Sequence, residues 1–235
     1  MRHYLLVDDN LAFAENLAEI VRDAGDEVTV TTDGRQALAH AREERFDALL
    51  TDMRMPLMDG AELVHEIRSV DPGLPAVLVT AYTGDHALQS ARQEGLLAAL
   101  QKPVPVERLL SLLALARRDG LVAIVEDDLG LSDNLTEALR ERGFSAVAAA
   151  SVTETEKLSG GRPCCALADL RVPGGPSGEA LKRLKARFAD LPVLVISGYA
   201  DDHLPAPGEE IVRKPFDTGA LLAKVERLYD ERGTL

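Results

Sequence analysis

The stretch LLTDMRMPLMDG, residues 49–60, places an aspartate directly after a short apolar run. Pro56 and Gly60, which interrupt regular structure, follow shortly afterwards. In one interpretation, Asp52 simply caps the turn after a strand. In the other, the fold holds its carboxylate at the carboxyl edge of a sheet, where side chains that carry out chemistry gather. The rest of the sequence decides between the two.

Short apolar runs alternate with segments of helical periodicity on both sides of this stretch. Continuous apolar strands separated by helices indicate a parallel sheet that is buried on both faces. We therefore predict a flavodoxin-like, doubly wound α/β fold with a five-stranded parallel sheet flanked by helices. In the first half we expect strands at residues 3–7, 27–30, 47–51, 75–80 and 97–100, and helices at residues 11–25, 34–44, 61–70, 85–95 and 107–118.

The same pattern of strands and helices occurs twice along the chain. LLTDMRMP recurs as ALADLRVP, PAVLVTAY as PVLVISGY, and QKPV as RKPF. Each copy is long enough to have its own core, so we predict two domains, residues 1–118 and 119–235. Their joint, Arg117 to Gly120, is so short that it leaves the domains little freedom to separate.

The second copy departs from the pattern before its last strand. Its segment ADDHLPAPGEE carries Pro205, Pro207 and Gly208 where the fourth helix is due. A proline inside a helix costs about 3 kcal/mol. We therefore expect the fourth helix of the second domain to be degenerate.

Composition excludes several classes of protein. The chain is 46% hydrophobic and 28% charged, as in a protein with a packed core, and its apolar runs are too short to span a bilayer. A net charge of −13 and 4% aromatic residues argue against a nucleic-acid-binding surface. We therefore expect a cytoplasmic protein that binds neither nucleic acid nor membrane. The adjacent Cys164 and Cys165 are predicted to be buried apolar side chains.

Side chains that can react or bind ions fall at the ends of successive predicted strands in both copies. Carboxylates that meet at one sheet edge repel each other, and a hard cation such as Mg²⁺ relieves this repulsion. A hydroxyl and a lysine beside them would contact an anion, and phosphoryl is the anion that a carboxylate can accept covalently. The residues are Asp8, Asp9, Asp52, Thr80 and Lys102 in the first copy, and Glu126, Asp127, Asp169, Ser197 and Lys214 in the second.

With these motifs, both halves resemble the receiver domain of bacterial two-component response regulators. The resemblance covers nearly the whole chain and rests on VDDN, TDMRMPLMDG, VTAY and QKP in the first copy and VEDD, ADLRVPGG, ISGY and RKPF in the second. It implies that Asp52 and Asp169 accept a phosphoryl group from a phosphohistidine. It also implies that Thr80 and Ser197 hydrogen-bond this group, that Lys102 and Lys214 pair with it, and that the bonds Lys102–Pro103 and Lys214–Pro215 are cis.

The resemblance further implies one Mg²⁺ in each domain. The ligands would be carboxylates and one backbone carbonyl, namely Asp8, Asp9, Asp52 and the Arg54 carbonyl in the first domain, and Glu126, Asp127, Asp169 and the Arg171 carbonyl in the second.

One residue of the usual receiver pattern is missing from both copies. Receivers commonly carry Tyr or Phe on the last strand, as a ring that turns inward on phosphorylation, but Ala99 and Ile211 stand there. Tyr82 and Tyr199 either replace this ring or are exposed loop aromatics, and the sequence leaves both interpretations open.

The predicted function is that of a tandem-receiver response regulator without an effector domain. It would accept phosphoryl from a sensor histidine kinase or a histidine phosphotransfer protein and signal by contact with a downstream protein, with homodimerisation through domain 1 as an option. It would not be an enzyme beyond its own phosphotransfer and autodephosphorylation. One alternative is a phosphorelay intermediate or phosphate sink, and another is a receiver fragment of a longer protein with an enzymatic output domain. His65 in HEIRS resembles a kinase phosphorylation motif, but no glycine-rich ATP-binding segment accompanies it.

Overall fold

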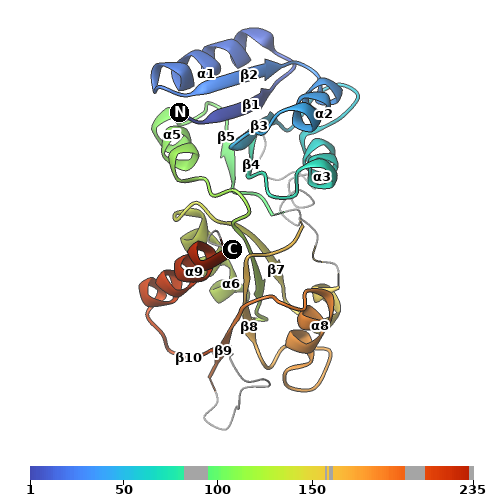
Figure 1. The fold of residues 1–235 in the computed structure, drawn as a ribbon, viewed down its shortest axis with the longest axis vertical. Coiled ribbons are helices and arrows are strands. Elements are labelled where there is room, and N and C mark those ends of the chain that lie inside the picture. Colours follow the sequence, from blue (N-terminus) through green and yellow to red (C-terminus); the bar gives the residue numbers. More distant parts are fainter. Residues whose placement is uncertain (82–94, 157, 159–160, 199–209, 233–235) are drawn as a thin grey trace.

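The computed structural model describes residues 1–81, 95–156, 158, 161–198 and 210–232. These residues form two five-stranded parallel sheets, one from each half of the chain, and helices flank both sheets. The halves follow one another along the long axis of the molecule (Figure 1). The predicted fold of two doubly wound α/β domains is confirmed. The exact domain limits at residues 118 and 119 stay a prediction.

The first sheet has the strand order β2-β1-β3-β4-β5, which places β3 at its centre between β1 and β4. All five strands lie where the sequence predicts them. The predicted fourth helix falls largely in residues 82–94, outside the described part of the chain. The elements are β1 (His3–Val7), α1 (Leu11–Asp23), β2 (Glu27–Thr31), α2 (Gly34–Glu43), β3 (Ala48–Asp52), α3 (Gly60–Val70), β4 (Ala76–Thr80), β5 (Ala98–Gln101) and α5 (Val106–Leu115).

Alternating side chains divide the first core into two layers. Leu5 and Val7 of β1 pack with residues of α2 and α3, such as Leu63. Tyr4 and Leu6 point the other way and pack with α1 and α5. The sheet is therefore sandwiched between two helical layers, as the continuous apolar strands predict.

The second half repeats this arrangement with the order β10-β9-β8-β6-β7, the same topology as in the first. One face of the sheet packs against α7 and α8, and the other against α6 and α9. The predicted degenerate helix falls in residues 199–209, outside the described residues. The elements are β6 (Leu121–Val125), α6 (Leu129–Arg140), β7 (Ser145–Ala149), α7 (Val152–Thr155), β8 (Cys165–Asp169), α8 (Glu179–Arg187), β9 (Val193–Ser197), β10 (Glu210–Arg213) and α9 (Thr218–Arg232). Cys164 and Cys165 are free and buried, as predicted.

Local sequence explains why helices begin where they do. The Asn10 side chain accepts a hydrogen bond from the Phe13 backbone and starts α1. Asp59 and Glu62 form a reciprocal capping box at the start of α3. Because Asp59 stands only a short loop after Asp52, this cap also fixes the path of the chain past the end of β3.

The joint between the halves is attached to both. Both terminal nitrogens of the Arg118 guanidinium make contacts in the first half: Nη2 binds the Asp71 carboxylate at 2.7 and 2.9 Å, and Nη1 donates to the Phe46 carbonyl. The backbone carbonyl of Arg118 accepts a hydrogen bond from the Tyr229 hydroxyl of α9 at 2.8 Å. Arg117 lies over the rings of Phe144 and Tyr229, at 4.8 and 5.3 Å.

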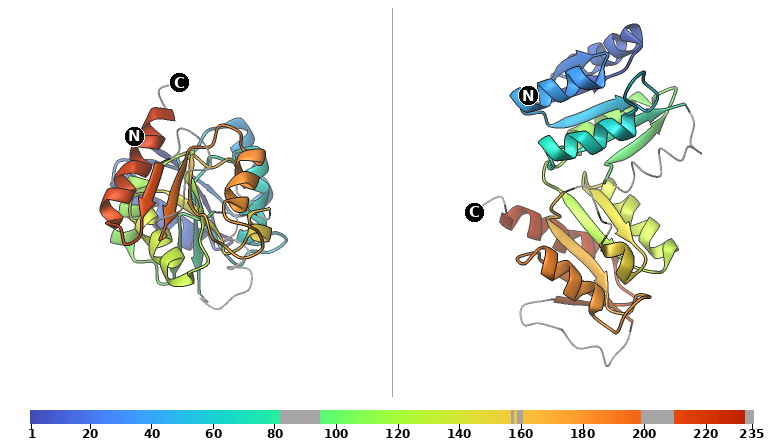
Figure 2. Two further views of the ribbon diagram at one scale, coloured as in Figure 1. Left: turned by 90° about the horizontal axis from the view of Figure 1, so that it is seen from below. Right: turned by 90° about the vertical axis from the view of Figure 1, so that its right-hand side faces the viewer.

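These contacts lie at the amino-terminal ends of the strands. Asp71 caps the end of α3, and Phe46 precedes β3. On the other side of the joint, the backbone N–H of Arg117 donates to the carbonyl of Gly143, in the loop that leads into β7. The carboxyl ends of the strands in each half are therefore directed away from the joint (Figure 2).

No helix within the described ranges is long and apolar enough to cross a membrane.

Candidate functional site

The strand ends of the first half bring the predicted residues together. Asp8 follows β1, Asp52 is the last residue of β3, and Thr80 is the last residue of β4. These three strands are neighbours in a parallel sheet, so their carboxyl ends share one edge. All three side chains are buried, while Asp9 is exposed.

Lys102 connects the two buried carboxylates of the first site. Its Nζ lies 2.6 Å from Oδ1 of Asp52 and 3.0 Å from Oδ2 of Asp8. The second oxygen of Asp52 accepts a hydrogen bond from the backbone N–H of Arg54 at 2.6 Å. Asp8 accepts another from the backbone N–H of Asn10 at 2.9 Å. Each carboxylate is thus oriented by one backbone donor and by the shared ammonium group.

The charge of Lys102 is favoured by this environment. Burial by itself lowers the pKa of a lysine, because it removes water from the ammonium group. The hydrogen bonds and negative charges of Asp52 and Asp8 outweigh this effect, and the pKa of Lys102 is raised. The first site therefore contains a fixed positive charge beside the predicted acceptor.

An aromatic ring also contacts this lysine. Nζ of Lys102 lies 4.3 Å from the centroid of the Phe13 ring, within the range of a cation–π interaction. The sequence pattern does not single out Phe13, because its apolar spacing in α1 marks it only as a core residue. Its place one turn into the helix that follows Asp8 and Asp9 is the one sequence signal that could have drawn attention to it.

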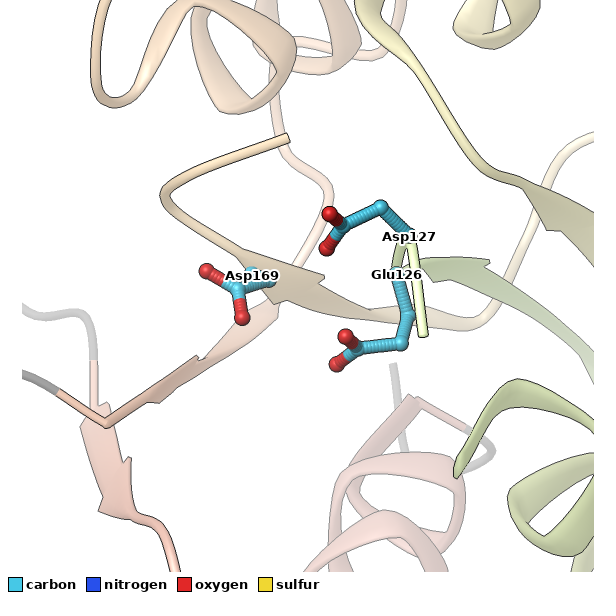
Figure 3. Close-up of side chains that lie close together, drawn as sticks. All are labelled: Glu126, Asp127 and Asp169. Carbon is cyan, nitrogen blue, oxygen red and sulfur yellow. The ribbon is translucent and has the colours of Figure 1, made fainter. Parts of the chain in front are cut away.

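The second site contains a tighter acidic cluster. Glu126, Asp127 and Asp169 each place one carboxylate oxygen within 4.8 Å of the others. Figure 3 shows the three carboxylates on the same side of the ends of β6 and β8. Among the described residues, the corresponding carboxylates of the first half, those of Asp8, Asp9 and Asp52, do not gather this closely. The two copies thus both have three carboxylates but differ in how closely these gather.

Lys214 holds the second site together as Lys102 does the first. Its Nζ lies 2.7 Å from both Glu126 and Asp169. The backbone N–H of Arg171 donates to Asp169 at 2.8 Å, which reproduces the bond from Arg54 to Asp52. The carbonyl groups of Arg54 and Arg171, which the resemblance names as ligands, stay a prediction.

The pKa values of the second site reflect crowding and burial. Burial raises the pKa of Glu126, and the charge of Asp169 adds to this, although Lys214 and a backbone hydrogen bond oppose it. Burial lowers the pKa of Lys214, but its bonds to Asp169 and Glu126 outweigh this, and the pKa is raised. Burial therefore leaves Glu126 with a raised carboxyl pKa.

The hydroxyl of the second site has an additional neighbour. Ser197 is completely buried at the end of β9, and Nη1 of Arg213 lies 3.5 Å from its Oγ. The sequence pattern does not single out Arg213. The sequence feature that could have drawn attention to it is its position directly before Lys214, where the first copy has Gln101.

The residues that replace the usual switch ring lie on the last strand of each sheet. Ala99 of β5 and Ile211 of β10 are partly buried against the apolar cores. Tyr82 and Tyr199 lie outside the described residues, so both interpretations of these tyrosines stay open.

The donor chemistry of both sites fits Mg²⁺. This ion prefers carboxylate, carbonyl and water oxygens at about 2.0–2.1 Å, so two of its ligands lie at most about 4.2 Å apart. The oxygens of Glu126, Asp127 and Asp169, within 4.8 Å of one another, gather where such an ion would lie. In the first half, Asp8 and Asp52 already share one cationic partner in Lys102.

Comparison with known proteins identifies the family. The response regulator receiver domain family matches the chain twice, over residues 4–114 and 122–226. The chain belongs to this family. It therefore consists of two response regulator receiver domains in tandem.

Individual relatives agree with this assignment. A response regulator receiver protein of Anaeromyxobacter sp. (strain Fw109-5) is 64% identical over 233 residues, which cover 99% of this chain and 98% of that protein. The transcriptional regulatory protein ZraR of Escherichia coli (strain K12) is 36% identical over 105 residues, which are 45% of this chain and 24% of that protein.

Solved structures resemble one half of the chain at a time. The receiver domain of the sensor histidine kinase PA1611 from Pseudomonas aeruginosa PAO1, which has a magnesium ion in its active site cleft, is 32% identical with a TM-score of 0.45. The match covers 48% of this chain and 93% of that domain. The chemotaxis protein CheY4 of Vibrio cholerae is 35% identical with a TM-score of 0.46, over 48% of this chain and 97% of that protein.

Proposed function

We propose that both receiver domains accept a phosphoryl group on aspartate, on Asp52 in domain 1 and on Asp169 in domain 2. The observation that carries this proposal is the same in both copies. A buried carboxylate ends a central strand, and a lysine ammonium lies 2.6 Å from it in domain 1 and 2.7 Å from it in domain 2. A carboxylate held in this way is a preorganised nucleophile beside a charge that attracts phosphoryl oxygens.

The transfer proceeds by displacement at phosphorus. A carboxylate oxygen of Asp52 or Asp169 forms the new P–O bond, and the bond from phosphorus to the leaving group of the donor breaks. With a phosphohistidine donor, the leaving imidazole takes up a proton. A bound Mg²⁺ would balance negative charge on the phosphoryl oxygens, with Asp8, Asp9 and Asp52 as its side-chain ligands in domain 1, and Glu126, Asp127 and Asp169 in domain 2.

The other residues bind and orient the transferred group. In domain 1, Lys102 exchanges part of its contact with Asp8 and Asp52 for the phosphoryl oxygens, and the Thr80 hydroxyl donates a hydrogen bond to them. Lys214 and Ser197 have these roles in domain 2. The backbone N–H groups of Arg54 and Arg171 keep the second oxygen of each acceptor occupied, so that the other oxygen faces the phosphorus.

The donor we propose is a histidine-phosphorylated protein, either a sensor kinase or a phosphotransfer protein. The phosphorylated state would then be read by a downstream protein. Transfer directly from one acceptor to the other within a chain is disfavoured, because the strand ends of the two halves are directed away from the joint. The absence of an effector domain, homodimerisation through domain 1 and the cytoplasmic location stay predictions from the sequence.

Labelling with acetyl phosphate in the presence of Mg²⁺ tests the proposal. We expect intact-mass measurement of the full chain to detect two phosphoryl adducts that hydroxylamine removes, as it does acyl phosphates. Asp52→Asn and Asp169→Asn should each abolish one adduct, and the double variant both, because an amide is not a nucleophile. Asp190→Asn, whose side chain is 90% exposed, is the matched control and should keep both. Full labelling of the double variant would refute the assignment.

The same variants can establish the direction of transfer. A purified histidine-phosphorylated partner should lose its label to the wild-type chain and not to the double variant. Return of label from the chain to unphosphorylated partner would identify a relay, whereas transfer in one direction only would identify a terminal response regulator.

A further inference from the structure

The two acceptor sites differ in the surroundings of their lysine. In domain 1 the Lys102 ammonium lies 4.3 Å from the centroid of the Phe13 ring. In domain 2 the repeat places Leu131 where domain 1 has Phe13, because LAFAENL aligns with LGLSDNL. Both side chains are partly buried against their own apolar cores. The chain therefore contains the same site with and without an aromatic neighbour.

The geometry around Lys102 gives the ring a specific effect. The ammonium group is held by the carboxylates of Asp52 and Asp8 and also lies over the negative face of an aromatic ring. A lysine side chain has many rotamers, and an additional attraction reduces the number that it visits. The ring therefore limits the freedom of the ammonium group to swing out to solvent.

We propose that Phe13 is a positioning residue of the first receiver domain. Its ring holds the Lys102 ammonium beside Asp52, and domain 1 consequently accepts phosphoryl faster than it does with a leucine at this position. The effect on the rate rests on the function proposed above, whereas the contact between ring and ammonium does not.

The first test is spectroscopic and does not depend on activity. Protons that lie over an aromatic ring are shifted upfield, so the ε-methylene protons of Lys102 should resonate upfield of those of Lys214 in ¹³C-lysine-labelled protein. Phe13→Leu should remove this shift without unfolding the domain, since leucine fills the same place in the repeat. Leu131→Phe should create a shift at Lys214. A Lys102 resonance that does not change in Phe13→Leu would overturn the proposal.

The second test measures phosphoryl acceptance by Asp52 alone. In an Asp169→Asn background, Phe13→Leu should slow labelling by acetyl phosphate about two- to fivefold, the effect of a cation–π interaction of ordinary strength. Phe13→Trp should restore the rate, because its ring has the stronger attraction for cations. An unchanged rate in Phe13→Leu would refute the effect on acceptance.

Fluorinated phenylalanine at position 13 separates electrostatics from packing. Successive fluorination weakens the negative face of the ring while its shape changes little, so the labelling rate should fall stepwise with the number of fluorine atoms. Equal rates in all fluorinated forms would mean that the ring only packs, and the proposal would be wrong. If the wild-type chain is not labelled on Asp52 at all, the proposed function fails, and the Lys102 resonance still decides whether Phe13 holds the ammonium.

Discussion

Replacement of Arg118 by methionine should uncouple the two receiver domains. The methionine keeps much of the apolar stem but removes the two hydrogen bonds to Asp71, at 2.7 and 2.9 Å, and the bond to the Phe46 carbonyl. The side chains of Arg118 and Asp71 are only 18% and 17% exposed, so the carboxylate of Asp71 is left largely buried without its cation. This is the situation in which loss of one partner is costly.

The magnitude lies between two limits. A fully buried pair that loses one partner costs about 3–5 kcal/mol, and an exposed pair about 0–1 kcal/mol. For this mostly buried pair with two short bonds we expect a loss of about 2 kcal/mol in the free energy of unfolding. In a chain of this size, that loss lowers Tm by about 4–8 °C.

The chain offers a control ion pair near the same joint. Arg108 of α5 pairs with Glu137 of α6 at 3.3 Å, but these side chains are 60% and 54% exposed. Arg108→Met should therefore cost at most about 1 kcal/mol. Both variants remove one ion pair and one positive charge, and the Arg118 pair differs from the Arg108 pair in its burial and in the additional bond to the Phe46 carbonyl.

Differential scanning calorimetry and hydrogen exchange measure the effect. Arg118→Met should broaden or split the unfolding transition and increase exchange of the Asp119 amide, which donates to the carbonyl of Gly73 at 2.9 Å. A double-mutant cycle with Asp71→Asn should give a coupling energy of about 1–3 kcal/mol. Equal Tm shifts for Arg118→Met and Arg108→Met, or no coupling with Asp71, would refute the reasoning.

Three further predictions concern single residues. Tyr4→Phe should remove a fall in stability between about pH 10 and 12, which a pH series of urea unfolding detects in the wild type. Burial, with the charge of Asp26 as the next cause, raises the pKa of Tyr4 from 10.0 to about 12. In this pH range the native state therefore retains a proton that the unfolded state has lost. Gly60→Ala should destabilise domain 1 by about 2 kcal/mol in chemical unfolding, because the Cβ of the alanine would lie 2.3 Å from the Asp52 carbonyl oxygen. A loss of stability below about 0.5 kcal/mol would contradict this. In EDTA, the stability of domain 2 should fall as the pH rises above about 4.5, because the native state retains a proton on Glu126 that the unfolded state has lost. Mg²⁺ or Glu126→Gln should reduce this fall. Identical pH profiles for the wild type and Glu126→Gln would refute the raised pKa of Glu126.

Much of the fold could be predicted from the sequence, because its pattern is local. Apolar runs such as ALLTD in β3 and AVLVT in β4 are buried along their whole length, as expected for inner strands of a parallel sheet covered on both faces. The cis bonds predicted at Lys102–Pro103 and Lys214–Pro215 are confirmed. The position of a residue at a strand end was also sufficient to bring Asp52 and Lys102 together.

The contacts that distinguish the two sites could not be predicted in this way. Phe13 and Arg213 contact site residues through side-chain rotamers that tertiary packing selects, and their sequence neighbourhoods indicate only a helix and a strand. The closer gathering of carboxylates around Glu126 is likewise a matter of side-chain direction and not of spacing along the chain. Sequence position specifies which strand end a residue occupies, but not which way its side chain turns.

The same limit applies to Arg118. In the sequence, Arg117 and Arg118 are a basic pair at a domain boundary, and an exposed linker would be an ordinary place for them. The structure instead directs Arg117 to rings of the second half and Arg118 to a carboxylate of the first. Two adjacent residues of one type thus attach the joint in opposite directions.

The position of the joint decides how the two acceptor sites can influence each other. Both sites lie at the strand ends directed away from it, so an effect of phosphorylation must pass through a domain to reach the other half. Helix α9 offers one continuous route in domain 2. It begins at Thr218, shortly after Lys214, and its last turns contact the joint through Tyr229, which donates to the Arg118 carbonyl, and Glu226, which pairs with Arg117 at 3.4 Å. If Asp169 is phosphorylated as proposed, a movement of Lys214 toward the phosphoryl group would act on the start of this helix, and separation of the halves at Arg118 would remove the far end of the route.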